Sequence, residues 1–532
     1  MNVSMLLDMA AEGFGERVVV GRAEDGLTAS GLRALSAGAA RLVRAAGADA
    51  ILYLAVNGPA FPVALFAAAR AGVPLVPVNY RLGGEQLDAL LANHPRALGI
   101  AEPEQADALR RAGVPAVSPA EWLAAAAGSD TENTETIKST EKAENTKNTE
   151  KAEHAEDTED EPADPDSPAV LIYTSGTTSA PKGVVLRHHH LVSYVLGTVE
   201  FAGAGADEAA LMSVPPYHIA AVSNVLTNLY AGRRVVTLEQ FTPDGWLDLV
   251  RQQRITNAMV VPTMLARIMD TEGLDRSVPS LRALAYGGAK MPVRVIETAL
   301  RAWPRVDFVN AYGLTETSST IAVLGPEEHR AAVASDDLAV RARLGSVGRP
   351  VPSVELEVRD ETGAVAAAGE PGQIWVRGEQ VSGEYAGQGP SVDERGFFHT
   401  RDQGRLDADG YLHVEGRVDD TIIRGAENIA PAEIEDVLLR HPDVLDAVVV
   451  GVPDEEWGQR IEAVVVPRGG ANVDTEELRE SIRATLRGSR TPDRIACWPE
   501  LPRTPTGKLV RRDIVAGLTA DETAERQPTG GS

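Results

Sequence analysis

The sequence contains very little cysteine and no long apolar run, and both absences narrow its class. Cys497 is the only cysteine among the 532 residues. Intrachain disulfides and clusters of cysteine ligands are therefore excluded, which leads us to expect a protein of the reducing cytoplasm. No stretch approaches the roughly 20 apolar residues of a membrane span. The N-terminal MNVSMLLDMAAEGFGERVVV lacks the basic start of a signal peptide, so we expect none.

Positive charge is also scarce. The chain has 51 Lys and Arg residues against 77 Asp and Glu residues, a formal net charge of −26. Such a balance repels nucleic acid and anionic membranes, so we expect neither as a partner. The length is too great for one compact core, so we expect two or more domains.

Much of the negative charge lies in one segment, residues 129–167. It contains 14 acidic residues and 4 lysines, repeats short TEN, TEK and AE units, and has Ile137 as its only large aliphatic side chain. Such a segment buries too little apolar surface to offset the entropy of ordering. We expect a disordered acidic insertion that acts as a solvated spacer; a partner-binding segment is the alternative.

The rest of the first 417 residues alternates between strand and helix patterns. Residues 51–82 read as strand, helix and strand, and residues 282–313 repeat this order, with a helical pattern over 291–303. This alternation predicts helix-covered β-sheets that are at least partly parallel. The strict alternation of VELEV, residues 354–358, predicts an antiparallel β subdomain with one exposed face.

The pattern of helices and strands in the sequence changes near Val418. A helical pattern over 430–441, strands over 444–452 and 461–467, and a capping box of Asp474 and Glu477 indicate a small α+β domain. We therefore predict an α/β N-terminal domain of residues 1–417 and a small C-terminal domain of residues 418–532. Residues 518–532, rich in Thr, Glu and Gly, are expected to be disordered.

Residues 174–183, TSGTTSAPKG, follow the apolar run AVLIY and precede another apolar segment. A Gly/Ser/Thr loop between two strands can surround phosphate oxygens with backbone N–H groups. It is no Walker P-loop, because Lys182 lies between Pro181 and Gly183. A nucleotide-triphosphate loop of another type is predicted, with a plain linker as the alternative.

Four segments, in order, resemble one known family. YTSGTTSAPKG (173–183) resembles the signature of the adenylate-forming superfamily, which comprises acyl- and aryl-CoA synthetases, peptide-synthetase adenylation domains and firefly luciferase. AYGLTET (311–317), HTRDQGRLDADGYLHVEGRVDD (399–420) and PRTPTGKLVRR (502–512) resemble its later motifs. The resemblance spans nearly the whole chain outside the insertion. It implies an AMP-forming acid–thiol ligase: ATP and a carboxylic acid give an acyl-adenylate and pyrophosphate, and the acyl group then passes to a thiol.

The resemblance assigns the nucleotide site. The expected triphosphate loop comprises Thr174, Ser175, Gly176, Thr177, Thr178 and Lys182. Thr315 is expected to contact the α-phosphate and Glu316 to ligate Mg²⁺ with a hard oxygen. The resemblance places adenine and ribose against Gly288, Ala289, Tyr312, Asp402 and Arg417.

Lys508 is the expected catalytic cation, placed between the carboxylate and the α-phosphate. In the family the small domain rotates after adenylation about a hinge, which corresponds to Asp419 here. Such a rotation would withdraw the lysine and present another face of the mobile C-terminal domain to the thiol. A catalytically silent scaffold is disfavoured because Lys508, Glu316 and Asp402 are all present.

The expected acid pocket includes Tyr217, His218, Gly287, Gly288 and Asn310. The segment PPYHIAAVSN, residues 215–224, has no acidic residue to pair with an ammonium group. An α-amino acid is therefore disfavoured, and an aryl or short-to-medium apolar acid is expected. The three adjacent histidines at 188–190 cannot all face one ion, so we expect no metal site there.

The thiol site is expected at Gly425, Ala426 and Glu427, with CoA as co-substrate. Three departures from the family pattern stand out: Arg401 where glycine is usual, Arg424 where serine is frequent, and Ala426 where a second glycine shapes the thiol tunnel. Ala426 therefore leaves other acceptors open: an acyl carrier protein, an amine, or activation of a small oxyanion such as nitrite. A luciferase-like oxygenase shares these motifs. We expect a free-standing enzyme, because no carrier segment follows, and a homodimer stays open.

Overall fold

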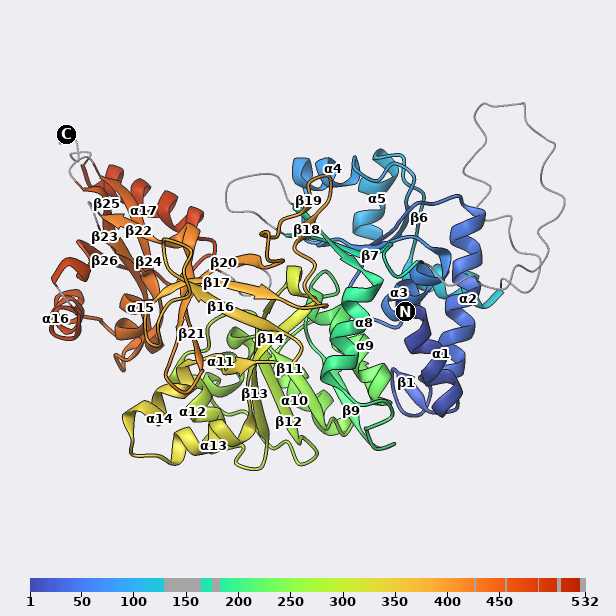
Figure 1. The fold of residues 1–532 in the computed structure, drawn as a ribbon, viewed down its shortest axis with the longest axis horizontal. Helices are drawn as coiled ribbons and strands as arrows, with labels where there is room; N and C mark the ends of the chain where they lie inside the picture. The colour runs from blue at the N-terminus through green and yellow to red at the C-terminus, as the bar shows by residue number, and fades with distance from the viewer. Residues whose placement is uncertain are drawn as a thin grey trace.

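The computed structural model describes residues 1–128, 164–174, 182–424, 427–454, 457–486, 488–504 and 509–526. Most of the acidic insertion lies outside these ranges, so its disorder stays a prediction. Figure 1 shows a large N-terminal part and, at one end of the molecule, a smaller C-terminal part coloured orange to red.

Two large sheets form the frame of the N-terminal part. The first has eight strands in the order β19 (Gly389–Pro390), β18 (Glu384–Tyr385), β8 (Lys182–Arg187), β7 (Pro168–Thr174), β4 (Leu75–Pro77), β3 (Ile51–Leu54), β5 (Leu98–Ala101) and β6 (Ala116–Val117). The second has nine, in the order β15 (Arg349–Pro350), β14 (Ser319–Leu324), β13 (Asp307–Leu314), β12 (Ala283–Gly287), β11 (Asn257–Val260), β9 (Ala209–Met212), β10 (Arg234–Thr237), β1 (Val18–Val20) and β2 (Leu27–Thr28). Both sheets are parallel in the middle and antiparallel toward an edge, which confirms the predicted fold class.

Helices cover both faces of both sheets because the parallel strands are apolar on each side. One buried cluster joins the facing sides of the two sheets through α1 (Val3–Phe14), α2 (Ala29–Ala45), α3 (Ala60–Ala71), α6 (Pro119–Gly128), α8 (His188–Thr198) and α9 (Ile219–Ala231). The outer face of the first sheet packs on α4 (Gly84–Leu91) and α5 (Pro103–Arg111). The outer face of the second packs on α10 (Pro243–Gln252), α11 (Pro262–Asp270) and α12 (Val293–Ala302). The helices α13 (Pro326–Ala334) and α14 (Leu338–Ala342) follow β14.

A four-stranded antiparallel sheet completes the N-terminal part, as VELEV predicted. Its strands are β16 (Glu355–Arg359), β17 (Gly372–Arg377), β20 (Phe398–Leu406) and β21 (Leu412–Arg417). One short turn, η3 (Val418–Asp420), connects β21 to the C-terminal part. Figure 1 shows the C-terminal part beside this sheet, with α15 (Pro431–Leu439) in contact with β21.

The C-terminal part has its own buried clusters. It contains a hairpin of β22 (Ile422–Arg424) and β23 (Glu427–Ile429), a sheet of β24 (Val444–Asp454), β25 (Gly458–Pro467) and β26 (Arg494–Cys497), and the helices α15, α16 (Thr475–Thr485) and α17 (Arg511–Arg526). Asp474 caps α16, as predicted: its carboxylate accepts from the backbone N–H groups of Glu476 and Glu477.

The prediction of disorder from residue 518 is wrong as far as Arg526. Helix α17 continues through this segment, and Ile514 and Leu518 on it are fully buried against β24 and β25. Two apolar side chains one helical turn apart are enough to hold a polar helix on the sheet. None of the helices in the described ranges is long and apolar enough to cross a bilayer.

Candidate active site

The Gly/Ser/Thr loop connects two paired strands. β7 and β8 are antiparallel, with Thr174 opposite Lys182, and the Thr174 hydroxyl donates to the Lys182 carbonyl oxygen at 3.4 Å. The two predicted strands on either side of residues 175–181 are confirmed. Ser175, Gly176, Thr177 and Thr178 lie outside the described residues, so their contacts stay predictions.

A tyrosine that sequence analysis missed joins two of the predicted residues. The Lys182 ammonium nitrogen lies 5.7 Å from the centroid of the Tyr385 ring, and the Tyr385 hydroxyl donates to Glu316 Oε1 at 2.9 Å. Burial, together with the nearby Glu316 carboxylate, raises the pKa of Tyr385 far above its ordinary value. Tyr385 is therefore a neutral donor that lies between Glu316 and Lys182, the first residue of β8. In one sequence, nothing distinguishes it from an ordinary strand tyrosine.

Glu316 lies in a tight turn with a strained exit. The turn is η1 (Thr315–Thr317), and the Glu316 carbonyl oxygen accepts from the Ser382 N–H at 2.8 Å. Ser318 and Ser319 follow with φ values of 56° and 119°, in a region that favours glycine. Such strain persists only where the surroundings hold it, and it concentrates at functional sites.

The metal-binding capacity of this region rests on one carboxylate. The described residues contain no group of three or more His, Cys, Asp or Glu side chains that could enclose an ion. One Glu316 oxygen accepts from Tyr385, and no hydrogen bond from a described residue reaches the other. Mg²⁺ at nucleotide sites is commonly bound by one or two carboxylates plus substrate phosphates, so Glu316 fits that ion.

The predicted ribose residues are brought together across long sequence distances. The Tyr312 hydroxyl donates to Asp402 Oδ2 at 2.6 Å, and Arg417 Nε lies 3.4 Å from Asp402 Oδ1. Asp402 and Arg417 are opposite each other on β20 and β21, and Asp402 is only 8% exposed. Burial and the Asp402 charge raise the pKa of Tyr312 well above its ordinary value, so the phenol stays protonated.

Two glycines keep the carboxyl end of β12 free of side chains. A β-carbon on Gly287 would lie 2.2 Å from the Ala311 carbonyl oxygen, so only glycine fits there. Gly288 has φ +84°, a conformation that other residues rarely adopt. Ala289 follows in the loop before α12. The end of β12 therefore presents backbone without side chains at these two positions.

The predicted acid pocket is only partly tested by the geometry. Tyr217 and His218 immediately precede α9, with ring centroids 4.8 Å apart. Tyr217 is buried, and burial raises its pKa to about 12; its hydroxyl has no hydrogen-bond partner among the described residues. The Asn310 side-chain amide donates to the Ser346 carbonyl oxygen at 3.0 Å, so this N–H already has a partner within the protein.

The unusual Arg401 lies on β20 and contacts the turn that leads to the C-terminal part. It has φ 64°, where the expected glycine would be unstrained, and its guanidinium lies 3.4 Å from the Asp419 carboxylate in η3. Glu427 is exposed and lies 3.7 Å from Arg490. Gly425, Ala426 and Lys508 lie outside the described residues.

Comparison with known proteins defines the class of this chain, an AMP-forming acid–thiol ligase. The chain belongs to the AMP-binding enzyme family: residues 7–386 match that family, and residues 433–508 match the AMP-binding enzyme C-terminal domain.

Known relatives cover almost the full length. The chain is 34% identical to a feruloyl-CoA synthase of Amycolatopsis sp over 482 residues, 89% of this chain and 90% of that one. It is 32% identical to the fatty acid–[acyl-carrier-protein] ligase ScoC of Streptomyces coeruleorubidus, over 89% of this chain and 88% of the relative. Among solved structures, the O-succinylbenzoate coenzyme A synthetase of Bacillus subtilis in complex with ATP and magnesium ion matches with TM-score 0.77 and 27% identity, covering 95% and 98% of the two chains.

Proposed function

We propose that this enzyme couples an apolar or aryl carboxylic acid to coenzyme A. An oxygen of the acid attacks the α-phosphorus of ATP, and pyrophosphate leaves with the electron pair of the broken P–O bond. The thiol sulfur of CoA then attacks the acyl carbon; AMP leaves and the thiol proton is released. The observation that carries the proposal is the contact of Tyr385 with both Lys182 and Glu316 beside the paired strands β7 and β8.

The first step brings two anions together in a strongly negative protein. Unit charges 4 Å apart interact by about 1 kcal/mol in water and about 4 kcal/mol at an effective dielectric constant of 20. Fixed cations are therefore required where charge develops. We assign this role to Lys508 and Arg417 at the α-phosphate, with Thr315 as a hydrogen-bond donor and Lys182 at the outer phosphates.

The nucleotide would be bound by residues from the ends of β12 and β13 in the nine-stranded sheet and from β20 in the four-stranded sheet. Asp402 would accept from the ribose hydroxyls, Tyr312 would lie against adenine, and Gly287, Gly288 and Ala289 would let the base and acyl group approach. Mg²⁺ would be held by Glu316 and would neutralise phosphate charge when bound.

The acid is assigned as apolar or aryl on the surroundings of Tyr217 and His218. No acidic residue occurs in 215–224, and an unpaired ammonium group buried there would be costly. The feruloyl-CoA synthase relative, named for an aryl acid, supports this assignment. The relative ScoC, named for an acyl carrier protein, supports a second candidate, in which the same adenylate is passed to a carrier-protein thiol.

A two-stage assay tests the proposal. The enzyme is incubated with ATP, Mg²⁺ and a panel of aryl, aliphatic and α-amino acids, and pyrophosphate release is measured before CoA is added and thioesters are sought by mass spectrometry. We expect pyrophosphate release with aryl or apolar acids and a CoA thioester of the same acid. Pyrophosphate release without a CoA thioester would favour the carrier-protein candidate. A preference for α-amino acids would contradict the acid assignment.

A further inference from the structure

Arg401 has a strained backbone, and no step of the proposed reaction uses its side chain. Its φ of 64° lies in the left-handed region, where a residue with a β-carbon is uncommon and glycine is unstrained. Strain of this kind costs free energy and is concentrated at ligand sites and switch regions. A long charged side chain at this position therefore points to a contact that glycine could not make.

A bulge in β20 sets the direction of Arg401. In the pairing of the two strands, β17 has the single residue Ile374 opposite residues 400–402 of β20. The Thr400 hydroxyl fixes the bulge, because it donates to the Ile374 carbonyl oxygen at 2.8 Å and accepts from the Asp402 N–H at 3.1 Å. Bulges near active sites commonly re-aim side chains. Here Asp402 faces the candidate nucleotide site, and the neighbouring Arg401 faces the turn η3.

The connection between the two parts lies against β20 at two places. Arg401 Nη1 is 3.4 Å from Asp419 Oδ2, and the Thr421 hydroxyl donates to Gln403 Oε1 at 3.3 Å. The two β20 residues belong to the N-terminal part, whereas their partners lie in η3 and directly after it. A rotation of the C-terminal part about η3 therefore changes both contacts.

Two anions compete for the Arg401 guanidinium, the Asp419 carboxylate and the phosphates of bound ATP. The charge of Arg401 acts on the candidate active site: burial raises the pKa of Tyr385, and the positive charge of Arg401 partly opposes this rise. In the described structure, however, the guanidinium lies against Asp419. The geometry therefore supports a contact with the turn, and a phosphate contact is the alternative that an experiment must separate from it.

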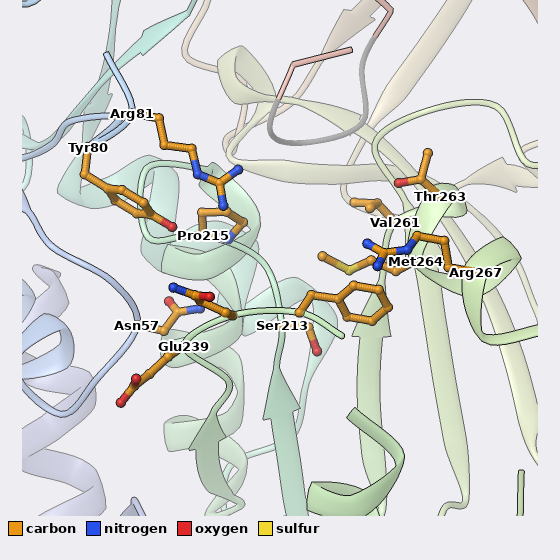
Figure 2. Close-up of a pocket in the computed structure, with 12 residues that line it drawn as sticks. Asn57, Tyr80, Arg81, Ser213, Pro215, Glu239, Val261, Thr263, Met264 and Arg267 are labelled. Carbon is orange, nitrogen blue, oxygen red and sulfur yellow. The ribbon is translucent and has the colours of Figure 1, made fainter. Parts of the chain in front are cut away.

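The cavity beside the candidate site gives Arg401 no other role. This cavity of about 220 Å³ is lined by residues between positions 57 and 267, and Figure 2 shows Tyr80 and Arg81 on one side of it and Arg267 on the other. Its lining includes no described residue of β20 or η3. Arg401 is therefore separate from the cavity.

We propose that Arg401 is a positioning residue: its ion pair with Asp419 stabilises the described arrangement of the two parts and so sets the balance between adenylation and thioester formation. The inference rests on the proposed function, which requires both steps, and deepens it by naming a residue that controls the change between them. The bulge fixes one end of the pair in the N-terminal part, and the other end lies on the connection itself. An exposed pair is weak enough to break and form again in every catalytic cycle.

The two steps are measured separately in variants of Arg401. In Arg401→Gln and Arg401→Gly, the ratio of ATP–pyrophosphate exchange to thioester formation should change about two- to fivefold, in the same direction, as expected for an exposed ion pair. Glycine removes the strain and the charge and glutamine removes only the charge, so equal changes assign the effect to the charge. Arg401→Lys keeps the charge and should keep the ratio. Arg330→Gln, which removes an exposed pair with Asp307 inside the N-terminal part, is the matched control.

A distance measurement tests the arrangement of the two parts without using activity. Cys497 is the only cysteine of the chain and is exposed in the C-terminal part. One added cysteine, Glu361→Cys in the exposed turn between β16 and β17, therefore gives a pair of spin labels across the two parts. We expect one dominant distance in the chain with native Arg401. The share of a second distance should rise about two- to fivefold in Arg401→Gln and stay unchanged in Arg401→Lys.

The outcomes separate this inference from the proposed function. Equal distance distributions with Arg401 and with Arg401→Gln would overturn the inference. A raised KM for ATP in the exchange reaction, with unchanged distances, would place the guanidinium on the phosphates and overturn it as well. Failure of the unmodified enzyme to form any CoA thioester would contradict the proposed function, while the distances would still decide the role of Arg401. Thermal melting of each variant confirms that the fold is retained.

Discussion

A single side chain, Tyr385, is expected to have a large effect on the rate of adenylation. Its hydroxyl is the only described hydrogen-bond donor to the Glu316 carboxylate, and its ring lies under the Lys182 ammonium group. A carboxylate that must bind Mg²⁺ together with mobile phosphates gains from being held in one orientation before they arrive. The same tyrosine ring contacts the Lys182 ammonium group at the start of β8.

We predict that Tyr385→Phe lowers the rate of ATP–pyrophosphate exchange by about 10- to 100-fold, because a hydrogen bond to a charged group is lost. The concentration of Mg²⁺ that gives half the maximal rate should rise in parallel. Tyr411→Phe is the control: Tyr411 lies under Arg343 and Arg349, away from Glu316. An exchange rate equal to that of the unmodified enzyme would show that Glu316 needs no such support.

Gly287 offers a second test at this scale. Its missing β-carbon would lie 2.2 Å from the Ala311 carbonyl oxygen, so Gly287→Ala must push β12 away from β13. We predict a loss of about 1–3 kcal/mol in the free energy of unfolding, the range for overpacked sites, and loss of exchange activity. Gly345→Ala, with nothing within 4 Å of the added carbon, should keep both. Equal melting temperatures for the two variants would contradict the assignment.

At the scale of elements, helices, strands and caps could be predicted from the sequence wherever a local residue pattern determines them. The strand before the Gly/Ser/Thr loop, the helix after Pro292 and the cap at Asp474 were all predictable. Packing decided the rest. The predicted helix over 291–303 forms, but its pattern does not say which apolar residues are buried: Val293 is 43% exposed, whereas Val295, Ile296 and Ala299 face the core. Helix α17 forms against composition because Leu518 finds a buried place that no local signal encodes.

Two buried histidines in the first turn of α8 are expected to make the stability of the fold depend on pH. His188 Nδ1 accepts from the Val3 N–H at 3.2 Å, and His190 Nδ1 accepts from the Arg187 N–H at 3.1 Å. Both histidines are buried, and each accepts a hydrogen bond from a backbone N–H near the start of the helix. Burial, and for His188 also the positive N-terminus, lowers the pKa of His188 to about 4; burial lowers that of His190 to about 3.

Both folded-state pKa values lie below the unfolded value of about 6.5. Protonation therefore favours the unfolded chain: the stabilisation is complete above pH 6.5 and is lost as the pH falls toward 4. Each imidazole should cost up to about 1.4 kcal/mol per pH unit in that window. We predict that His188→Asn, which keeps an acceptor, flattens the decline of the melting temperature between pH 6.5 and 4. His189→Asn, at the more exposed neighbour, should retain the full decline. Identical pH profiles for His188→Asn and the unmodified chain would contradict this.

At the scale of the whole molecule, ion pairs between described residues join the C-terminal part to the N-terminal part, among them the Arg401–Asp419 pair at η3. Lys290, directly after Ala289, pairs with Asp436 on α15 at 2.7 Å, and Arg468 lies 3.8 Å from Asp270 on α11. The only described covalent connection between the parts is the short turn η3. An arrangement held by exposed charges and one turn can be exchanged for another at low cost.

We predict that Asp436→Asn changes the rates of adenylation and of thioester formation in opposite directions, because it weakens one arrangement of the two parts. An exposed pair contributes at most about 1 kcal/mol, so each rate should change by about fivefold or less, and added salt should reduce the difference. Asp207→Asn removes an exposed pair with Arg282 inside the N-terminal part and serves as the control. Changes in the same direction, or none, would contradict the domain rotation.

The candidate site also shows what a single sequence cannot specify at this scale. Tyr312 and Asp402 were assigned to the nucleotide separately, by resemblance, and their hydrogen bond over 90 residues follows from the register of β20 and β13 in different sheets.

The central claim is that a carboxylate oxygen attacks the α-phosphorus of ATP in this site. The most direct measurement uses an accepted acid labelled with ¹⁸O in its carboxylate, a complete reaction with ATP, Mg²⁺ and CoA, and mass analysis of the products. The account predicts one ¹⁸O atom in AMP and none in pyrophosphate, because the attacking oxygen stays on phosphorus when the thiol releases AMP. Unlabelled AMP, or ADP and labelled phosphate in its place, would contradict it.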